Sequence, residues 1–280
     1  PYDDDRVMAG QGTIALEMLA QQPGLEVLLV PIGGGGLIAG MAVAAKGIKP
    51  DLEVFGVQSE RFPAMAQWIA GQPVHCDRFT VAEGIAVRNP GRRTRRVVQR
   101  LVSDILLAGE GEIEDAVLML LQIEKTVVEG AGACGLAALL KSRRRFRHKQ
   151  VGLVLCGGNI DLMVLSSIIQ RGLARDAQLV RLRVKTRDVP GELARVSGLI
   201  GKHGGNIMEV HHQRAFSAEP LQTAMVDFTM RTRGVDHLSR IVRGLRDAGY
   251  RTSLPDGDVL PRLYAKREQK AQVRLTAGCG

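Results

Sequence analysis

Four consecutive glycines, Gly33 to Gly36, stand between the apolar run VLLVPI and the helix-forming run LIAGMAVAAKGI. Ordering such residues costs about 0.5–1 kcal/mol each relative to alanine, and one or two glycines usually suffice for a tight turn. A simple turn is therefore the weaker of two interpretations. Between a strand and the N-terminus of a helix, residues without side chains let successive backbone N–H groups point at one anion, assisted by the helix dipole. The four glycines predict a phosphate-binding loop.

The segments around this loop alternate between helix and strand patterns. Residues 12–22 are expected to form a helix, and residues 26–32 a strand whose apolar run is typical of a strand covered by helices on both faces. A helix ending at Gly47 and a second strand at residues 52–60 follow. Together these elements make a βαβ crossover, and its parallel sheet binds ligands beyond the carboxyl ends of the strands. The first part of the chain is predicted to be an α/β domain built on a parallel sheet.

Two ligands are compatible with a phosphate-binding loop at this place. Residues 34–39 satisfy the dinucleotide pattern G-x-G-x-x-A, and Glu60 ends the second strand where such a site keeps its ribose-binding acid. That match is weak, because four glycines satisfy many patterns. A second glycine turn, CGGN at residues 156–159, follows an expected strand at residues 151–155, and two glycine-rich strand ends in one sheet can hold two ends of one ligand. A dinucleotide-binding oxidoreductase leaves this second turn unexplained and is the weaker hypothesis.

A second domain is expected after a break at residues 171–178. Residues 179–186 alternate apolar and basic side chains, as a half-exposed strand should, and the pattern continues as helix, strand, strand, helix and strand up to residue 254. This βαββαβ order is typical of the ferredoxin-like fold. The predicted organisation is a first domain at residues 1–172, a small α+β domain at residues 179–255, and a basic tail at residues 256–280.

The composition argues against several other classes of function. No apolar run approaches the roughly 20 residues of a membrane span, and the acidic start PYDDDR is unlike a signal peptide, so a cytoplasmic location without membrane contact is expected. The four cysteines lack CxxC spacing, and the adjacent His211 and His212 point to opposite faces of a strand, so no metal site is expected. The net charge of +9 comes from short arginine-rich patches with few aromatic residues, which favours a solvated surface over nucleic-acid binding.

The motifs in combination resemble a known family. PIGGGGLIAG, EVFGVQSE, VVEGAGACGLAALL and VLCGGNIDL, in this order, resemble the serine/threonine dehydratases of the fold type II pyridoxal phosphate enzymes, and among them the threonine dehydratases, also called threonine ammonia-lyases. The likeness covers residues 1 to about 170. It implies a pyridoxal 5′-phosphate cofactor and a parallel sheet that is incomplete at its N-terminal side here. The cofactor-binding residues that it implies are Gly33, Gly34, Gly35, Gly36, Leu37, Glu129 and Cys156.

Each implied residue has a role in this resemblance. The glycines and Leu37 bind the phosphate through backbone N–H groups, and Glu129 lies near the cofactor ring, although a carboxylate at the start of a helix is an equal alternative. Cys156 faces the pyridine nitrogen, with a buried structural thiol as its alternative. A neutral partner for that nitrogen makes the cofactor a weaker electron sink, which suits β-elimination better than transamination. TVAEG at residues 80–84 resembles another active-site stretch of the family, but one carboxylate does not establish a metal.

One departure from the family concerns its catalytic lysine. That lysine holds the cofactor covalently and removes the α-proton before the β-hydroxyl leaves, so that L-threonine, and L-serine as a second substrate, lose ammonia; L-threonine gives 2-oxobutanoate. It lies upstream of the four glycines, and here no lysine precedes Gly33, while Lys46 and Lys49 sit at an exposed helix end. No catalytic residue is assigned. The chain is expected to be the C-terminal part of a longer enzyme, or a truncated reading frame, and inactive alone.

The second domain also resembles a known family. DVPGEL at residues 188–193 and HGGNI at residues 203–207 resemble the ACT domain. This resemblance implies an amino-acid effector that binds where two such domains of a homo-oligomer meet, at Pro190, Gly191, Glu192 and Asn206. Allosteric control by branched-chain amino acids fits a role in isoleucine biosynthesis, to which threonine deamination leads. The alternatives are a domain that only dimerises and a non-catalytic protein that senses an amino acid.

Overall fold

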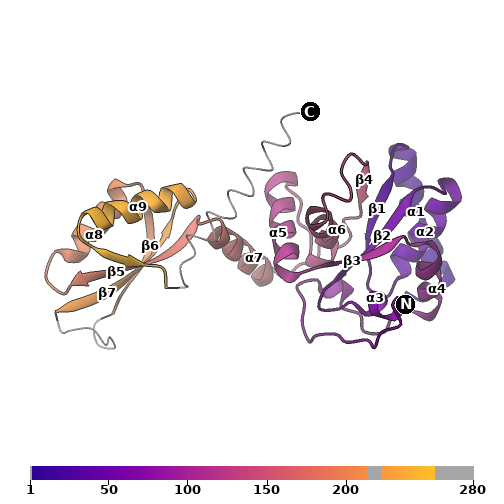
Figure 1. The fold of residues 1–280 in the computed structure, drawn as a ribbon, viewed down its shortest axis with the longest axis horizontal. Coiled ribbons are helices and arrows are strands. Elements are labelled where there is room, and N and C mark those ends of the chain that lie inside the picture. The colour runs from indigo at the N-terminus through magenta and orange to yellow at the C-terminus, as the bar shows by residue number, and fades with distance from the viewer. Residues whose placement is uncertain (1, 214–221, 256–280) are drawn as a thin grey trace. The chain divides into compact units, whose positions relative to one another are not determined.

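The computed structural model describes residues 2–213 and 222–255, so the expected basic tail at residues 256–280 lies outside the described residues. The chain divides into two compact units, Pro1–Ile168 and the part from Ile169 onward (Figure 1). Among the described residues, no helix is long and apolar enough to cross a membrane.

The first unit is built on a four-stranded parallel sheet. Its strands are β1 (Val27–Pro31), β2 (Glu53–Ser59), β3 (Asp104–Ala108) and β4 (Val151–Leu153), in the spatial order β3-β2-β1-β4. All three pairings are parallel, so the carboxyl ends of the four strands lie at the same edge of the sheet. This confirms the predicted α/β class. β3 was not expected from the sequence, and the strand expected at residues 151–155 ends at Leu153.

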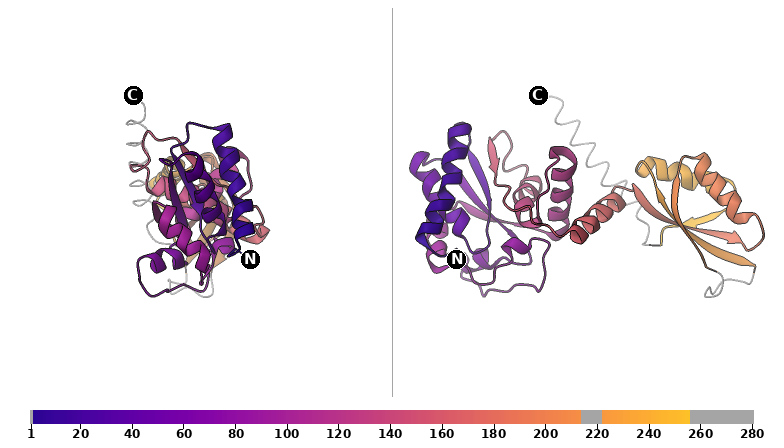
Figure 2. Two further views of the ribbon diagram at one scale, coloured as in Figure 1. Left: turned by 90° about the vertical axis from the view of Figure 1, so that its right-hand side faces the viewer. Right: turned by 180° about the vertical axis from the view of Figure 1, so that it is seen from behind.

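Helices cover both faces of this sheet. They are α1 (Asp5–Gln21), α2 (Gly36–Ile48), α3 (Ala64–Ile69), α4 (Arg92–Leu101), α5 (Glu110–Met119) and α6 (Gly130–Lys141), with the turns η1 (Glu83–Ile85) and η2 (Leu120–Glu124). Figures 1 and 2 show α1, α2 and α4 on one side of the sheet and α5 and α6 on the other. Every residue of β1 is buried as a result, which explains its apolar sequence.

The second unit is an antiparallel sheet with two helices. It consists of β5 (Leu179–Arg187), α8 (Glu192–Lys202), β6 (Asn206–Gln213), β7 (Thr223–Arg231), α9 (Val235–Asp247) and β8 (Arg251–Ser253). The spatial order β6-β7-β5-β8 is that of a ferredoxin-like fold. Apolar residues of β5 and β7 alternate with polar ones and pack against α8 and α9 around Val196, Phe228 and Ile241. The predicted βαββαβ pattern is confirmed.

One predicted boundary is wrong. The break expected at residues 171–178 is largely helical, because α7 (Leu162–Arg175) continues through it. The division between the two units falls within this helix. α7 ends in a turn in which Gln178 N–H donates to the carbonyl of Leu173 and Ala177 adopts a left-handed φ of 52°.

Candidate functional site

The glycine loop connects β1 to α2 at the carboxyl edge of the parallel sheet. α2 begins at Gly36, and its N-cap is Gly35, whose φ is 95° and which provides no side-chain cap. Within the described residues, no backbone N–H from Gly33 to Leu37 has a hydrogen-bond acceptor, although Gly34, Gly35 and Gly36 are buried. Buried N–H groups are rarely left without a partner in folded proteins. An anion at the start of α2 is the partner that these donors fit.

The residues at the start of the described chain lie over this loop. A Cβ at Gly34 would come within 2.1 Å of the ring of Tyr2, and one at Gly36 within 2.8 Å of the Tyr2 carbonyl oxygen. The Tyr2 hydroxyl donates to the carbonyl of Asn89 at 2.9 Å, which fixes the ring. Side chains at positions 34 and 36 are therefore excluded by close packing. Sequence reasoning missed Tyr2, which carries no signal of this long-range contact.

The second glycine turn leaves the neighbouring strand at the same edge. β4 pairs with β1, so the CGGN residues follow a strand adjacent to the one that enters the glycine loop. The Cys156 side chain is half-buried. Desolvation by burial, together with the nearby charge of Glu129, raises the pKa of the Cys156 thiol. At neutral pH the thiol is therefore protonated and uncharged, as a neutral partner for a ring nitrogen requires.

Glu129 joins the second turn to the stretch at residues 80–84. Its backbone N–H donates to the carbonyl of Gly157 at 3.1 Å. A Cβ at Gly157 would lie 2.3 Å, and one at Gly84 2.5 Å, from Glu129 Oε1. Glu129 occupies the N-cap position of α6, but its side chain makes no capping hydrogen bond. The carboxylate thus faces the two glycines, and the alternative of a helix-capping carboxylate has no hydrogen bond to support it.

Residues 84–87 connect these groups to the glycine loop. A Cβ at Gly33 would lie 3.3 Å from Ile85 Cα and 3.5 Å from the Gly84 carbonyl oxygen. The preceding Thr80 is buried, and its hydroxyl donates to Glu110 at 2.6 Å while Val81 N–H donates to the same carboxylate at 2.7 Å. The structure therefore brings the glycine loop, Glu129 and the turn containing Cys156 to one edge. Glu110, which anchors the stretch between them, has no sequence signal beyond its place in the first turn of α5.

No lysine of the first unit reaches the glycine loop. The lysines of residues 1–168 are Lys46, Lys49, Lys125, Lys141 and Lys149. The first two donate to backbone carbonyls near the C-terminal end of α2, and Lys125 to that of Gln122. Lys149 pairs with Glu53, and Lys141 pairs with Glu60 at 2.6 Å and with Glu112 at 3.0 Å. Glu60, the acid that a dinucleotide site would use, is thus engaged by a lysine.

The predicted effector residues do not all come together within one second unit. A hollow of about 400 Å³ is lined by residues 186–193 and by His212 and Val226, so it includes Pro190, Gly191 and Glu192. Asn206 is not part of it. Asn206 pairs with Arg231 at one end of β7, whereas the strand leading to the 188–191 loop ends at Arg187, opposite Thr223 at the other end. Within one chain, Asn206 and Gly191 therefore lie at opposite ends of the sheet.

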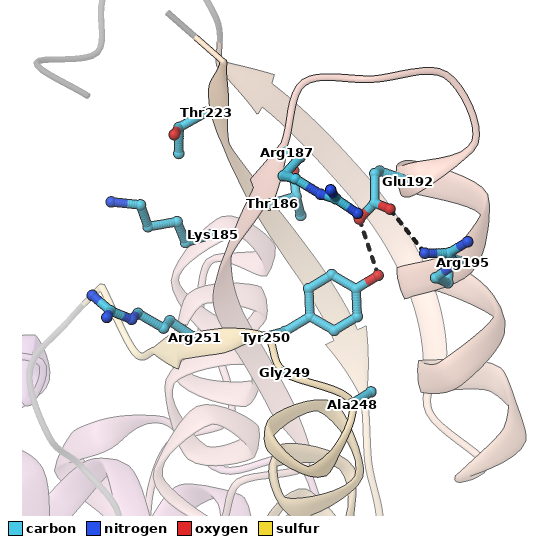
Figure 3. Close-up of a pocket in the computed structure, with 10 residues that line it drawn as sticks. All are labelled: Lys185, Thr186, Arg187, Glu192, Arg195, Thr223, Ala248, Gly249, Tyr250 and Arg251. Carbon is cyan, nitrogen blue, oxygen red and sulfur yellow. Dashed lines mark hydrogen bonds and ion pairs between the residues drawn. The ribbon is translucent and has the colours of Figure 1, made fainter. Parts of the chain in front are cut away.

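Glu192 also lines a neighbouring pocket of about 360 Å³ between β5, α8 and β8 (Figure 3). Its carboxylate accepts a hydrogen bond from the Tyr250 hydroxyl at 3.0 Å and pairs with Arg195 at 3.1 Å. Burial, and then the carboxylate of Glu192, raise the pKa of the Tyr250 hydroxyl. Both oxygens of Glu192 are occupied, so this buried side chain ties the start of α8 to the residue that precedes β8.

Comparison with known proteins was made on sequence and on structure. A family model for pyridoxal-phosphate dependent enzymes matches residues 1–157, and one for the ACT domain matches residues 175–249. The chain is 38% identical over 258 residues to an L-threonine ammonia-lyase of Thermotoga maritima and 39% identical over 252 residues to one of Geobacter sulfurreducens. Each alignment covers 89% of this chain and 63% of the relative. The chain thus spans somewhat less than two thirds of the length of these relatives.

Solved structures give the same picture for the first unit. A bacterial-strain threonine deaminase, designated T.th., superposes with a TM-score of 0.54 at 36% identity, covering 57% of this chain and 54% of that one. Maize serine racemase superposes with a TM-score of 0.53 at 36% identity, covering 60% of this chain and 54% of the other.

Proposed function

Because the chain belongs to the pyridoxal-phosphate dependent enzymes and carries an ACT domain, we propose that its first unit holds pyridoxal 5′-phosphate for the elimination of ammonia from L-threonine, which yields 2-oxobutanoate. The resemblance found in the sequence is confirmed at the level of the family. The proposed reaction follows from the names of the relatives, L-threonine ammonia-lyase and threonine deaminase. L-Serine is proposed as a second substrate.

The observation that carries this proposal is the set of buried backbone donors from Gly33 to Leu37 without acceptors among the described residues. A phosphate ester carries close to two negative charges and three acceptor oxygens at neutral pH. The N–H groups of the loop and the dipole of α2 would bind it together. A plain turn would leave these donors unsatisfied, so it accounts for less of the geometry.

The other residues at this edge have proposed roles that their surroundings support. The cofactor, when bound, supplies an electron sink for the electron pair left at the substrate Cα. Cys156 would hold the ring nitrogen as an uncharged hydrogen-bonding partner, because burial keeps its thiol protonated. Glu129 would lie beside the ring, close to the two glycines that admit its carboxylate. An uncharged ring nitrogen favours elimination over transamination.

This 280-residue chain brings no lysine to the loop, and we propose that it binds the cofactor without turning over L-threonine by itself. In equilibrium dialysis, pyridoxal 5′-phosphate should bind at least about 30-fold more tightly than pyridoxal, because hydrogen bonds to a charged group contribute about 1.5–3 kcal/mol each. No 2-oxobutanoate should form. A chain extended at its N-terminus by the lysine-bearing segment of the family should form it. Equal affinity for the two compounds would contradict the proposed phosphate site.

For the second unit, we propose binding of an amino-acid effector between two copies of the chain. The proposal is supported by the placement of Asn206 and Gly191 at opposite ends of one sheet, since two copies arranged head to tail can bring them together. L-Isoleucine or L-valine should bind to the dimer, and Gly191→Ala should abolish binding, because the φ of 89° at Gly191 disfavours a side chain. Sedimentation velocity and calorimetry measure assembly and binding. Tight binding by a monomer would contradict the shared site, and effector binding without any cofactor binding would favour the non-catalytic sensor.

A further inference from the structure

We propose that Thr94 is a positioning residue of the phosphate loop, which orients the peptide between Gly34 and Gly35 so that its N–H faces the anion. The inference rests on the proposed function of the loop and assigns to that loop a controlling contact from α4, far along the sequence.

The Gly34 carbonyl oxygen accepts two hydrogen bonds from the start of α4. The Thr94 hydroxyl lies 2.7 Å from it and Gly91 N–H lies 3.1 Å from it. Thr94 has no exposed surface. Its hydroxyl also lies 3.1 Å from the carbonyl of Gly91, but a hydroxyl has one proton and the shorter contact claims it. The Gly91 carbonyl already accepts from Arg95 N–H at 3.1 Å. The proton of Thr94 is therefore committed to Gly34.

Fixing this carbonyl also fixes the next N–H. In a trans peptide the C=O and the following N–H point in opposite directions. With the Gly34 oxygen held against α4, the Gly35 N–H points away from α4. Two consecutive glycines restrict their shared peptide very little, so without the bonds to α4 it can rotate. A rotated peptide would present a carbonyl oxygen to the anion in place of a donor, and the loop would then repel the phosphate.

The start of α4 is itself held rigidly. The carboxylate of Asp3 accepts hydrogen bonds from the backbone N–H groups of Arg92, Arg93 and Thr94 at 2.9, 2.8 and 3.1 Å. Partial desolvation alone would raise the pKa of Asp3, but these backbone donors outweigh it and the pKa is lowered. Gly91 admits no side chain, since its Cβ would lie 2.4 Å from Asp3 Oδ1 and 2.7 Å from Thr94 Oγ1. Asp3, α4 and Thr94 thus form one continuous support for the Gly34 carbonyl.

Three substitutions at position 94 separate orientation from packing. Thr94→Val keeps the shape and removes the donor, Thr94→Ser keeps the donor, and Thr94→Ala removes both without adding bulk. Equilibrium dialysis of the full chain against pyridoxal 5′-phosphate and against pyridoxal gives the preference for the phosphorylated compound, and the ³¹P chemical shift of bound pyridoxal 5′-phosphate reports on the donors around it. Unfolding in urea, followed by the emission of Trp68, shows that each variant is folded.

We expect Thr94→Val to bind pyridoxal 5′-phosphate about tenfold more weakly, with a shifted ³¹P signal and unchanged affinity for pyridoxal, because one donor to the anion is lost. Thr94→Ser should retain the preference to within about threefold. If Thr94→Val does not fold, Thr94→Ala takes its place with the same expectation. Equal loss for both compounds, wild-type binding by the valine and alanine variants, or loss in a folded serine variant would overturn the inference while the proposed function stands. A wild-type chain that does not prefer the phosphorylated compound overturns both.

Discussion

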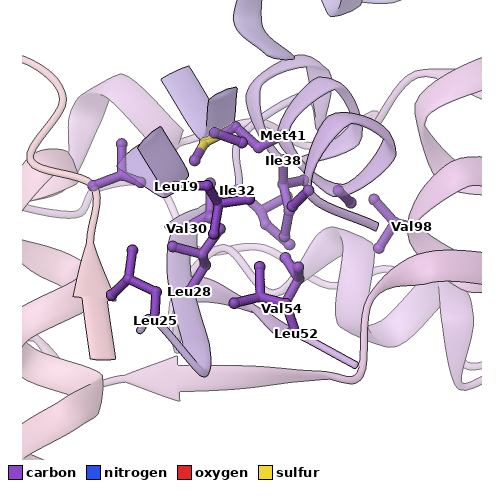
Figure 4. Packing of buried hydrophobic residues seen from close by; sticks show 14 of the residues in the cluster. Leu19, Leu25, Leu28, Val30, Ile32, Ile38, Met41, Leu52, Val54 and Val98 are labelled. Carbon is purple, nitrogen blue, oxygen red and sulfur yellow. The ribbon is translucent and has the colours of Figure 1, made fainter. Parts of the chain in front are cut away.

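Gly40→Ala should destabilise the first unit by at least about 3 kcal/mol, since overpacking of a rigid contact forces the backbone to move. α1 and α2 cross at Gly12 and Gly40, and a Cβ at Gly40 would lie 1.9 Å from the Met8 carbonyl oxygen and 2.9 Å from Gly12 N. Both obstacles are backbone atoms, so no side chain can rotate away. The helices would separate and expose the apolar cluster that they share, which includes Leu19 and Met41 (Figure 4). Urea unfolding followed by Trp68 emission measures the loss.

Trp68 is suited to this measurement because it is the single tryptophan of the chain and lies on α3 in the first unit. The matched control is Gly47→Ala in the same helix, where a Cβ meets no atom within 4 Å. That substitution should raise the free energy of unfolding by about 0.5–1 kcal/mol, because alanine favours the helix. If Gly40→Ala and Gly47→Ala gave the same free energy, the close crossing of α1 and α2 would be wrong.

The parts of the fold that could be predicted from the sequence are those with a local signal. The strand expected at residues 26–32 is β1, and the helix expected after the glycines is α2, because an apolar run and a glycine-bounded helix pattern are visible within a few residues. β3 lacks such a signal, since it is a short edge strand with only Ala108 fully buried. Its position is set by pairing with β2, a long-range contact. The neighbouring α4 is so rich in arginine that it was interpreted only as a basic surface patch.

The wrong boundary near residue 175 has a specific cause. Helices commonly end with a glycine in the left-handed conformation, and here Ala177 takes that conformation with a φ of 52°. Gly172 lies inside α7 instead. The glycine signal therefore pointed to a break inside the helix, and the residue that ends the helix carried no signal.

The candidate site divides along the same line. The glycine loop, Glu129 and the CGGN turn were predicted because each lies where a strand or helix begins or ends in the sequence. The supports from Tyr2, Asp3 and Thr94 were missed because they act across 87, 89 and 60 positions of the chain through hydrogen bonds to or from the backbone. Such contacts have no periodicity. For Asn206, the motif gave a residue type and only the strand register gave its distance from the 188–191 loop.

Gly35→Ala should lower the affinity of the chain for pyridoxal 5′-phosphate at least about 100-fold, which corresponds to about 2.7 kcal/mol. The φ of 95° at Gly35 is a conformation in which a Cβ costs roughly 1–2 kcal/mol. The added Cβ would also lie 2.8 Å from Met65 Cε and 2.9 Å from the Cβ and the hydroxyl of Thr94. It would therefore displace the group that holds the Gly34 carbonyl, so strain and loss of orientation act together.

Equilibrium dialysis measures this affinity, and Gly111→Ala serves as the matched control. Gly111 lies in α5, where a Cβ meets nothing within 4 Å, so the control should bind the cofactor as the wild type does. Because Gly35 lies next to Gly34, the loss should be larger than that of Thr94→Val, which leaves the glycine backbone intact. If Gly35→Ala bound the cofactor like Gly111→Ala while remaining folded, backbone N–H groups of this loop could not be what holds the phosphate.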